Sequence, residues 1–379
     1  MTLHIFNPEH DIALATNVAR FTPPHAGRQL RADLGFLPAF WAKDGDMVLV
    51  DDVEAALEAV CHLRRWAADV LFVPLSAAPL SPQPVAVEPW GWDQGVAEQL
   101  RLLGLHHLQP APDVLSAIRT LSSRQWAASH LLPALVSLGE GMTGQATYLD
   151  TPSSLSQLPY PCVLKAPWSS SGRGVRYLLQ PSHWQHNAAW AHNVIERQGG
   201  ILLEPYYNKV KDFGMEFEAL PDGQVVYRGL SLFHTVRGAY AGSLIATEQA
   251  KRNLLLRYID APRLDAVRDA ICRLMSPVLR GFYTGPFGVD MMVVAGEELS
   301  AQPANGVGGK LSTLNSQHST NWLLHPCVEL NLRRTMGHVA LSLPCDDTMP
   351  WRLMCIDYTN RYHFRIQDTT ENLLNTHLV

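Results

Sequence analysis

The stretch CVELNLR, residues 327–333, is the most informative segment of the chain, because its apolar and polar residues alternate. Successive side chains of a β-strand point to opposite faces, so Glu329, Asn331 and Arg333 share one face. Mg2+ takes oxygen ligands such as carboxylates and amide carbonyls, and an arginine can hold a phosphate through two parallel hydrogen bonds. The segment therefore predicts a metal and phosphate site. A solvated strand face with an incidental ion pair is the alternative.

A second acid lies in a similar apolar setting. Asp290 is flanked on both sides by apolar residues in FGVDMMVV, residues 287–294. A carboxylate is costly to bury unless a partner or a metal neutralises it, so a buried salt bridge would also explain this residue. Two apolar strands that each carry an acid at mid-length together predict a metal clamp made of Asp290, Glu329 and Asn331.

The segment VLKAPWSSSGRGV, residues 163–175, joins an apolar run to a loop of serines and glycines. Lys165 ends the apolar run, and a lysine is rarely buried without a partner. A phosphate would provide that partner. Serine hydroxyls and the N–H groups of a glycine-containing loop can contact further phosphate oxygens. The segment alone fits either a phosphate loop or a polar turn between two strands.

Residues 1–112 predict a separate α/β domain. Apolar runs at residues 3–6, 47–50 and 70–73 are typical of buried strands, and residues 53–66 have helical spacing. A strand, a helix and a strand at this length predict parallel pairing. Because the carboxyl ends of such strands face the ligand crevice, the residues after the first strand are expected to bind the acceptor substrate. They are Asn7, Glu9, His10 and Asp11, for which a turn and helix cap is the alternative.

Composition narrows the class of protein. The chain has 379 residues, and its formal charge of −5 with no cluster of lysines or arginines gives no sign of a nucleic-acid partner. No apolar run reaches membrane-spanning length, and the N-terminus has no secretion-signal pattern. Six cysteines without a Cys-x-x-Cys pair predict reduced thiols in a cytoplasmic protein.

Taken in chain order, these segments resemble the ATP-grasp superfamily over about residues 113–340. The shared pattern is a lysine strand, a Ser/Gly loop, a hinge strand ending in Glu204, Asp290 on a late strand, and the final Glu-x-Asn-x-Arg. The resemblance implies an α/β (α+β) fold, with the parallel-sheet domain of residues 1–112 followed by a two-lobed domain of residues 113–379. Residues 113–200 would form the smaller lobe and residues 201–379 the metal- and substrate-binding lobe. Residues 296–326 are expected to be a flexible excursion.

The resemblance also implies roles for single residues. Contacts to the ATP phosphates are implied for Arg124, Lys165, Ser169, Ser170, Ser171, Gly172 and Gly174. The adenine hinge is implied at Glu204, Pro205 and Tyr207, and the ribose hydroxyls at Glu216. Asp290, Glu329 and Asn331 would hold two Mg2+ ions, for which Mn2+ could substitute. Arg333 would neutralise the transferring phosphate or the acyl phosphate. Arg237 lies where related ligases have a substrate loop, from which it would also reach the γ-phosphate. Arg124 stands where a lysine is usual, and Gly288 where an arginine is common.

The implied activity is that of an ATP- and Mg2+-dependent ligase, which activates a carboxylate as an acyl phosphate and joins it to an amine. Its partners would be a small carboxylate and a small amine, with no nucleic acid and no membrane, and a homodimer is the expected assembly. Two alternatives stay open at this point. One is a kinase or phosphotransferase acting on a small molecule, and the other is a nucleotide-binding module without turnover.

Overall fold

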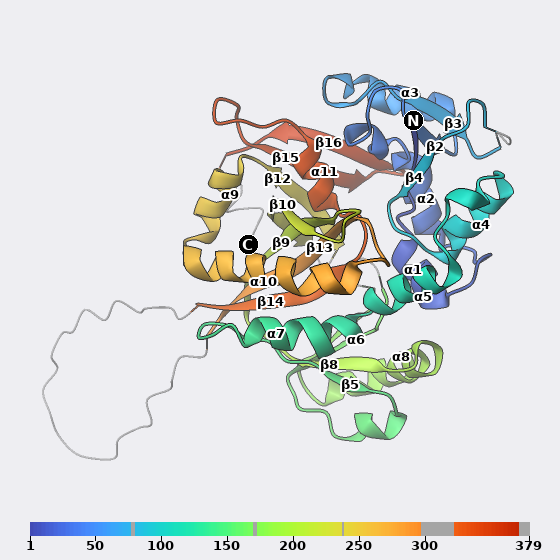
Figure 1. Ribbon diagram of the computed structural model, residues 1–379. Coiled ribbons are helices and arrows are strands. Elements are labelled where there is room, and N and C mark those ends of the chain that lie inside the picture. The colour runs from blue at the N-terminus through green and yellow to red at the C-terminus, as the bar shows by residue number, and fades with distance from the viewer. Residues whose placement is uncertain (77–79, 170–172, 237–238, 297–321, 371–379) are drawn as a thin grey trace, which may run out of the picture.

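The computed structural model describes residues 1–76, 80–169, 173–236, 239–296 and 322–370. Four sheets of four strands each organise this part of the chain (Figure 1). The predicted Ser170, Ser171, Gly172 and Arg237 lie outside the described residues, as do residues 297–321 of the expected excursion. No described helix is long and apolar enough to cross a membrane.

The N-terminal sheet is parallel, as predicted, with strand order β3-β2-β1-β4. Its strands are β1 (Thr2–Ile5), β2 (Met47–Val50), β3 (Leu71–Pro74) and β4 (Ala86–Pro89). Its helices are α1 (His10–Thr16), α2 (His25–Leu34), α3 (Val53–Cys61) and α4 (Gln94–Leu102), with short turns η1 (Leu37–Phe40), η2 (Arg64–Trp66) and η3 (His106–Leu108). Helix α4 begins after Asp93, whose carboxylate accepts a hydrogen bond from the Val96 N–H.

A small antiparallel sheet carries the lysine strand and the hinge. Its order is β5-β8-β6-β7, formed by β5 (Thr147–Leu149), β8 (Ile201–Pro205), β6 (Cys162–Lys165) and β7 (Val175–Leu178). Helix α8 (Ser182–Gln198) packs on this sheet and ends at Gly199, which adopts a left-handed conformation. The short turn η5 (Pro152–Ser156) completes the lobe.

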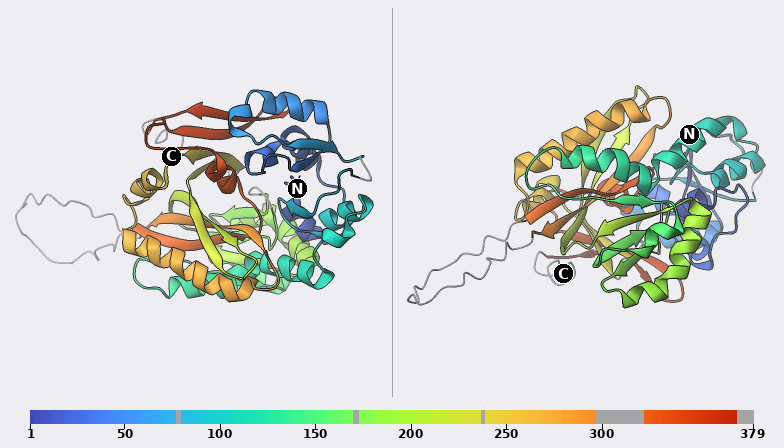
Figure 2. Two further views of the ribbon diagram at one scale, coloured as in Figure 1. Left: turned by 45° about the horizontal axis from the view of Figure 1, so that its top comes forward. Right: turned by 90° about the horizontal axis from the view of Figure 1, so that it is seen from below.

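The large antiparallel sheet carries the predicted acids. Its order is β10-β9-β13-β14, formed by β10 (Val225–Ser231), β9 (Lys209–Ala219), β13 (Gly285–Ala295) and β14 (Trp322–Asn331). Helix α10 (Ala261–Leu279) runs along one face of this sheet (Figure 2) and shares its hydrophobic core. The same core takes in α5 (Pro112–Leu121), α6 (Arg124–Trp126), the π-helical turn η4 (Ala127–Leu131) and α7 (Leu132–Val136).

The fourth sheet joins the C-terminal strands to the N-terminal domain. Its order is β11-β12-β15-β16, formed by β11 (Phe233–Val236), β12 (Ala239–Ile245), β15 (Arg352–Tyr358) and β16 (Tyr362–Asp368). Helix α11 (Met336–Ser342) contacts β12 of this sheet and β10 of the large sheet, and α9 (Glu248–Leu255) contacts β10. Phe364 on β16 stacks on Phe40, with ring centroids 5.0 Å apart, within a hydrophobic cluster shared by the two regions.

The structure corrects two expected boundaries. Residues 201–205 form β8 in the middle of the small sheet, so that sheet extends past residue 200, whereas α5 packs in the core of the large sheet. Residues 322–326 are not part of an excursion, because Trp322, Leu323 and Leu324 pair with β13 and extend β14. Their apolar side chains favour this pairing over a polar loop.

Candidate active site

The three predicted metal ligands lie together at one end of the large sheet. Asp290 on β13 pairs directly with Glu329 on β14, and Gly288 pairs with Asn331. The Asn331 Nδ2 group donates a hydrogen bond of 2.9 Å to Asp290 Oδ2. Asp290, Glu329 and Asn331 all line a cavity of about 410 Å3. The strand alternation thus places these side chains on one open face, as the sequence predicted.

Electrostatics at this end of the sheet favour a bound cation. Burial and the nearby charge of Glu329 raise the pKa of Asp290 to about 7. Two carboxylates and one amide oxygen suit Mg2+, which usually keeps several waters and takes further ligands from phosphates. Among the described residues, no group of three or more His, Cys, Asp and Glu side chains is placed to hold a metal. A metal at this donor set would need further ligands from substrate phosphates and water.

Arg333 follows β14 and reaches the N-terminal domain. Its Nε and Nη2 donate hydrogen bonds of 3.0 and 2.9 Å to the two carboxylate oxygens of Asp11, and Nη2 also donates to Asn331 Oδ1 at 2.8 Å. Burial opposes the ionisation of Asp11, yet the charge and hydrogen bonds of Arg333 hold the pKa of Asp11 below its usual value. The first turn of α1 is thereby fixed to the end of the large sheet that carries Asp290, Glu329 and Asn331.

The other predicted N-terminal residues lie in two different settings. Glu9 lines the same cavity as Asp11 and pairs with Arg31, at 2.9 Å between Glu9 Oε1 and Arg31 Nη1. Asn7 instead donates to the Gly91 carbonyl and to Asp93. His10 Nδ1 lies 3.0 Å from Asp93 Oδ2. Asn7 and His10 therefore hold the N-cap of α4 in place, and neither lines the cavity of the acids.

Arg124 connects the start of the predicted phosphate loop to the metal face, by which we mean the side chains of Asp290, Glu329 and Asn331, proposed below as metal ligands. Its Nη1 donates to Ser169 Oγ at 2.7 Å and to the Ala166 carbonyl at 2.8 Å. Its Nη2 lies 2.7 Å from Glu329 Oε1. A Cβ atom on Gly174 would lie 2.2 Å from Ser169 Oγ, so only glycine fits there. The guanidinium of Arg124 thus contacts both Ser169, at the start of the predicted phosphate loop, and Glu329.

Lys165 and Glu204 form a buried ion pair between β6 and β8. Lys165 Nζ lies 2.6 Å from Glu204 Oε2, and both side chains are less than a tenth exposed. Pro205 pairs with Cys162 in the same ladder. The Tyr207 hydroxyl accepts a hydrogen bond of 3.0 Å from the Gln145 N–H. The partner of the buried lysine in this structure is therefore the hinge glutamate.

Glu216, the predicted ribose ligand, lies beside Asp290. Burial and the charge of Asp290 raise the pKa of Glu216 to about 8. His338 Nε2 lies 3.1 Å from the Phe217 carbonyl, and His338 Nδ1 lies 3.0 Å from Glu216 Oε2. Burial, and then the charge of Arg334, lowers the pKa of His338 to about 3, so its ring is neutral. Nε2 therefore donates to the Phe217 carbonyl, and Nδ1 accepts from the Thr335 N–H at 3.2 Å. Glu216 Oε2 is buried without a hydrogen-bond partner.

Sequence reasoning missed two buried histidines, His325 and His338. His325 is 1% exposed on β14, and neither of its ring nitrogens has a hydrogen-bond partner. Burial and the charge of Lys165 lower its pKa to about 3, and the ring of Tyr207 packs edge-on against it at 5.3 Å. A single polar residue inside the apolar run WLLHPC was the available signal. Tyr207, in the predicted hinge, thus packs against a neutral imidazole on β14 that has no hydrogen-bond partner.

No protein-family model matches the chain. No curated protein matches it in sequence. Solved structures do match it in fold. The biotin carboxylase domain of the 2-oxoglutarate carboxylase of Hydrogenobacter thermophilus, in complex with MgADP, ADP and bicarbonate, aligns with a TM-score of 0.50 at 12% identity. That alignment covers 94% of this chain and 74% of that chain.

Two further structures are similar at somewhat lower scores. Biotin carboxylase from Campylobacter jejuni, in a β,γ-ATP complex, has a TM-score of 0.49 at 14% identity, covering 94% of this chain and 75% of that one. N5-carboxyaminoimidazole synthetase from Staphylococcus aureus, complexed with ADP, has a TM-score of 0.47 at 13% identity, covering 94% and 82%. The four sheets and the alignment at a TM-score of 0.50 show that the chain shares the fold of the biotin carboxylase domain from Hydrogenobacter thermophilus.

Proposed function

We propose that this protein is an ATP- and Mg2+-dependent ligase that joins a carboxylate to an amine. The observation that carries the proposal is the single cavity on which Asp290, Glu329 and Asn331 meet Arg333 and Asp11. This cavity lies between the large sheet and the loop after β1, so a nucleotide and a second substrate can meet in it. The similar proteins whose structures contain ADP or ATP support the choice of nucleotide.

The reaction has two steps. A carboxylate oxygen of the substrate attacks the γ-phosphorus of ATP, and ADP leaves, which gives an acyl phosphate. The amine nitrogen then attacks the acyl carbon, phosphate leaves, and the nitrogen loses a proton to give an amide. Mg2+ bound at Asp290, Glu329 and Asn331 would supply charge neutralisation at the phosphates. The number of ions and the use of Mn2+ remain predictions.

The residues of the chain contribute positioning and fixed charge. Arg333 holds a positive charge at the edge of the cavity, fixed by Asp11 and Asn331. Arg124 holds Ser169 next to Glu329, which places the start of the phosphate loop over the metal face. Lys165 would contact phosphate, and Glu204 would keep it oriented along β6 until the nucleotide binds. None of these steps needs a covalent intermediate on the protein.

The test is release of ADP and phosphate across a matrix of small carboxylates and amines. The ligase predicts that phosphate release requires ATP, one acid and one amine together. ADP formation without free phosphate, and with a phosphorylated product, would indicate the kinase alternative instead. ATP binding without any ADP formation across the matrix would contradict catalysis.

The metal assignment has a separate test. Glu329→Gln should lower turnover by at least 100-fold and raise the Mg2+ concentration that gives half-maximal rate, while ATP still binds. The matched control is Glu196→Gln, because Glu196 is exposed on α8, away from the cavity. Unchanged turnover and unchanged Mg2+ dependence in the Glu329 variant would remove Glu329 from the metal site.

A further inference from the structure

A second cavity, of about 400 Å3, lies in the N-terminal domain. It is lined by residues that follow β1, such as Glu9, and by residues of α4, which follows β4. The chain passes from β1 through β2 to β3 on one side and then crosses back to place β4 on the other side of β1. Ligands of open α/β sheets bind at the carboxyl ends of the strands where the order reverses in this way. The volume is in the range of small-molecule sites.

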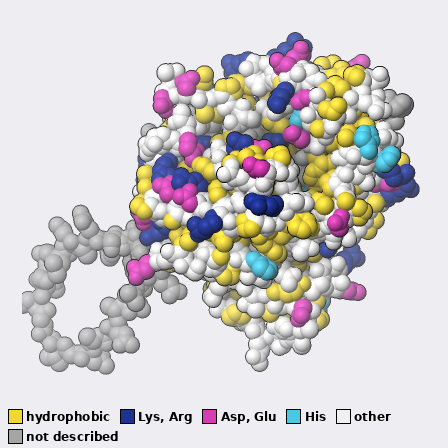
Figure 3. Space-filling model, viewed as in Figure 1, with side chains coloured by type: hydrophobic (Ala, Val, Ile, Leu, Met, Phe, Trp, Pro, Cys, Tyr) yellow, Lys and Arg dark blue, Asp and Glu magenta, His cyan; other side chains and the backbone are white. Residues whose placement is uncertain are grey.

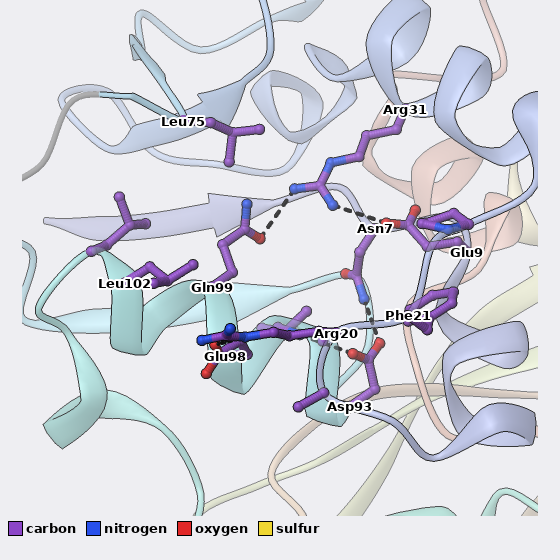
Figure 4. Close-up of a pocket in the computed structure, with 15 residues that line it drawn as sticks. Asn7, Glu9, Arg20, Phe21, Arg31, Leu75, Asp93, Glu98, Gln99 and Leu102 are labelled. Atoms are coloured by element: carbon purple, nitrogen blue, oxygen red, sulfur yellow. Dashed lines mark hydrogen bonds and ion pairs between the residues drawn. The ribbon is translucent and has the colours of Figure 1, made fainter.

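One end of this cavity is polar and incompletely paired (Figure 4). Glu9 is 6% exposed; its Oε1 accepts from Arg31, whereas Oε2 is buried without a hydrogen-bond partner. An unsatisfied buried acceptor destabilises the protein, and a charged one more so, because it has lost its water. A ligand with an N–H donor, above all an ammonium group, would satisfy this oxygen.

The same end offers donors for an anionic group. Arg31 on α2 donates from Nη1 to Glu9 and from Nη2 to Gln99 Oε1, at 2.9 and 3.1 Å. These two bonds use two of the five N–H donors of a guanidinium, and a carboxylate can accept from others. Glu9 and Arg31 lie next to each other, so one end of the cavity presents an anion and a cation side by side. That arrangement complements a zwitterion.

Neighbouring polar groups in the cavity are already paired. Asn7 binds the Gly91 carbonyl and Asp93, and Asp93 also caps α4. Arg20, with its side chain 73% exposed, pairs with Glu98. Glu9 and Arg31 are therefore the residues expected to bind the polar part of a ligand.

The opposite end of the cavity is apolar. In Figure 4, Leu75 and Leu102 lie across the cavity from Glu9. Leu75 and Leu102 remain 36% and 63% exposed although both residues are large and hydrophobic. Leu103 also lines the cavity. An aliphatic or aromatic group covering these side chains would remove apolar surface from water, at about 25 cal/mol per Å2.

We propose that this cavity binds a free α-amino acid with an apolar side chain. Its ammonium group donates to Glu9 Oε2, its carboxylate accepts from Arg31, and its side chain covers Leu75 and Leu102. Glu9 also lines the cavity of Asp290, Glu329 and Asn331, so the amino group is held by a residue common to both cavities. The inference rests on the proposed function in assigning this amino acid as the amine substrate, but its binding needs no turnover.

Calorimetric titration of the full chain without ATP tests the site directly. L-leucine and L-phenylalanine should bind, whereas 4-methylpentanoate, which lacks the amino group, and leucinamide, which lacks the carboxylate, should bind at least tenfold more weakly. Glu9→Gln keeps an oxygen for Arg31 but loses the charge, and should weaken leucine binding at least tenfold. Leu102→Ser alters an exposed position and should weaken leucine binding several-fold while leaving ATP binding unchanged.

The matched control is Glu58→Gln, because Glu58 is exposed on α3 and does not line the cavity. It should bind leucine as the unmodified protein does. The site is overturned if none of the amino acids binds, or if leucine and 4-methylpentanoate bind equally and Glu9→Gln changes nothing. Leucine binding without ADP or phosphate release in the acid and amine matrix would sink the ligase alone. Turnover in which the KM for the amine is unaffected by Glu9→Gln would sink the site alone.

Discussion

Replacing Asp290 by asparagine should stabilise the folded protein at pH 8 and reduce the pH dependence of its stability. The pKa of Asp290 rises from 3.8 to about 7 in the folded protein, because of burial and the charge of Glu329. A raised carboxyl pKa contributes no penalty below pH 3.8; stability then falls as the pH rises, until about pH 7. Each unit is worth about 1.4 kcal/mol, so the penalty grows from about 1.6 kcal/mol at pH 5 to about 4 kcal/mol at pH 8.

Urea unfolding followed by tryptophan fluorescence at pH 5, 6, 7 and 8 measures this difference. Asp290→Asn should remove a loss of about 3 kcal/mol between pH 5 and pH 8. It also removes the charge that helps to raise the pKa of Glu216, which acts in the same direction. The exposed Asp150→Asn is the control and should keep the original pH dependence. If Asp290→Asn kept it too, the described electrostatics of the metal face would be wrong.

Two further changes test the surroundings of the metal face. Arg124→Lys should raise the KM for ATP about tenfold, because a lysine cannot reach Ser169, the Ala166 carbonyl and Glu329 together; an unchanged KM would contradict the bridging role of Arg124. His325→Leu should raise the free energy of unfolding at pH 7 by about 1–3 kcal/mol, because it removes two unpaired buried nitrogens. It should also lessen the loss of stability on acidification from pH 6.5 to about 3, since the lowered pKa of His325 penalises its protonation in the folded state. The reasoning would be refuted if the urea midpoints of the variant and the unmodified protein differed by the same amount at pH 5 as at pH 7.

The sequence predicted those parts of the site that depend on local periodicity. Alternation along residues 327–333 was sufficient to place Glu329 and Asn331 on one face, and the apolar flanks of Asp290 signalled a second strand of the same kind. The parallel N-terminal sheet followed from the spacing of its strands and helices in the same way.

Contacts between distant segments could not be read in this way. Arg333 pairs with Asp11, which is 322 positions away, and no local pattern encodes that distance. The pairing of Lys165 with Glu204 depends on the antiparallel register of β6 and β8, which sets a glutamate where the sequence suggested a phosphate. His338 carries no periodic signal, because its role depends on its contacts with Glu216 and the Phe217 carbonyl on β9.

On the face seen in Figure 3, basic and acidic side chains are interspersed among apolar ones. All six cysteines are free of disulfides; Cys61 and Cys345 are exposed, whereas Cys162 and Cys327 are buried.

The stacking of Phe40 on Phe364 has a consequence for how the chain can be divided. Residues 1–112 are contiguous in sequence, yet part of their apolar core is supplied by strands more than two hundred residues later. A fragment cut after residue 112 would leave Phe36 and Phe40 facing water and should aggregate or unfold. A chimera that exchanges the N-terminal domain for a relative's would have to carry residues 352–368 with it. Residues 1–112 and residues 352–368 therefore depend on each other for a complete hydrophobic core.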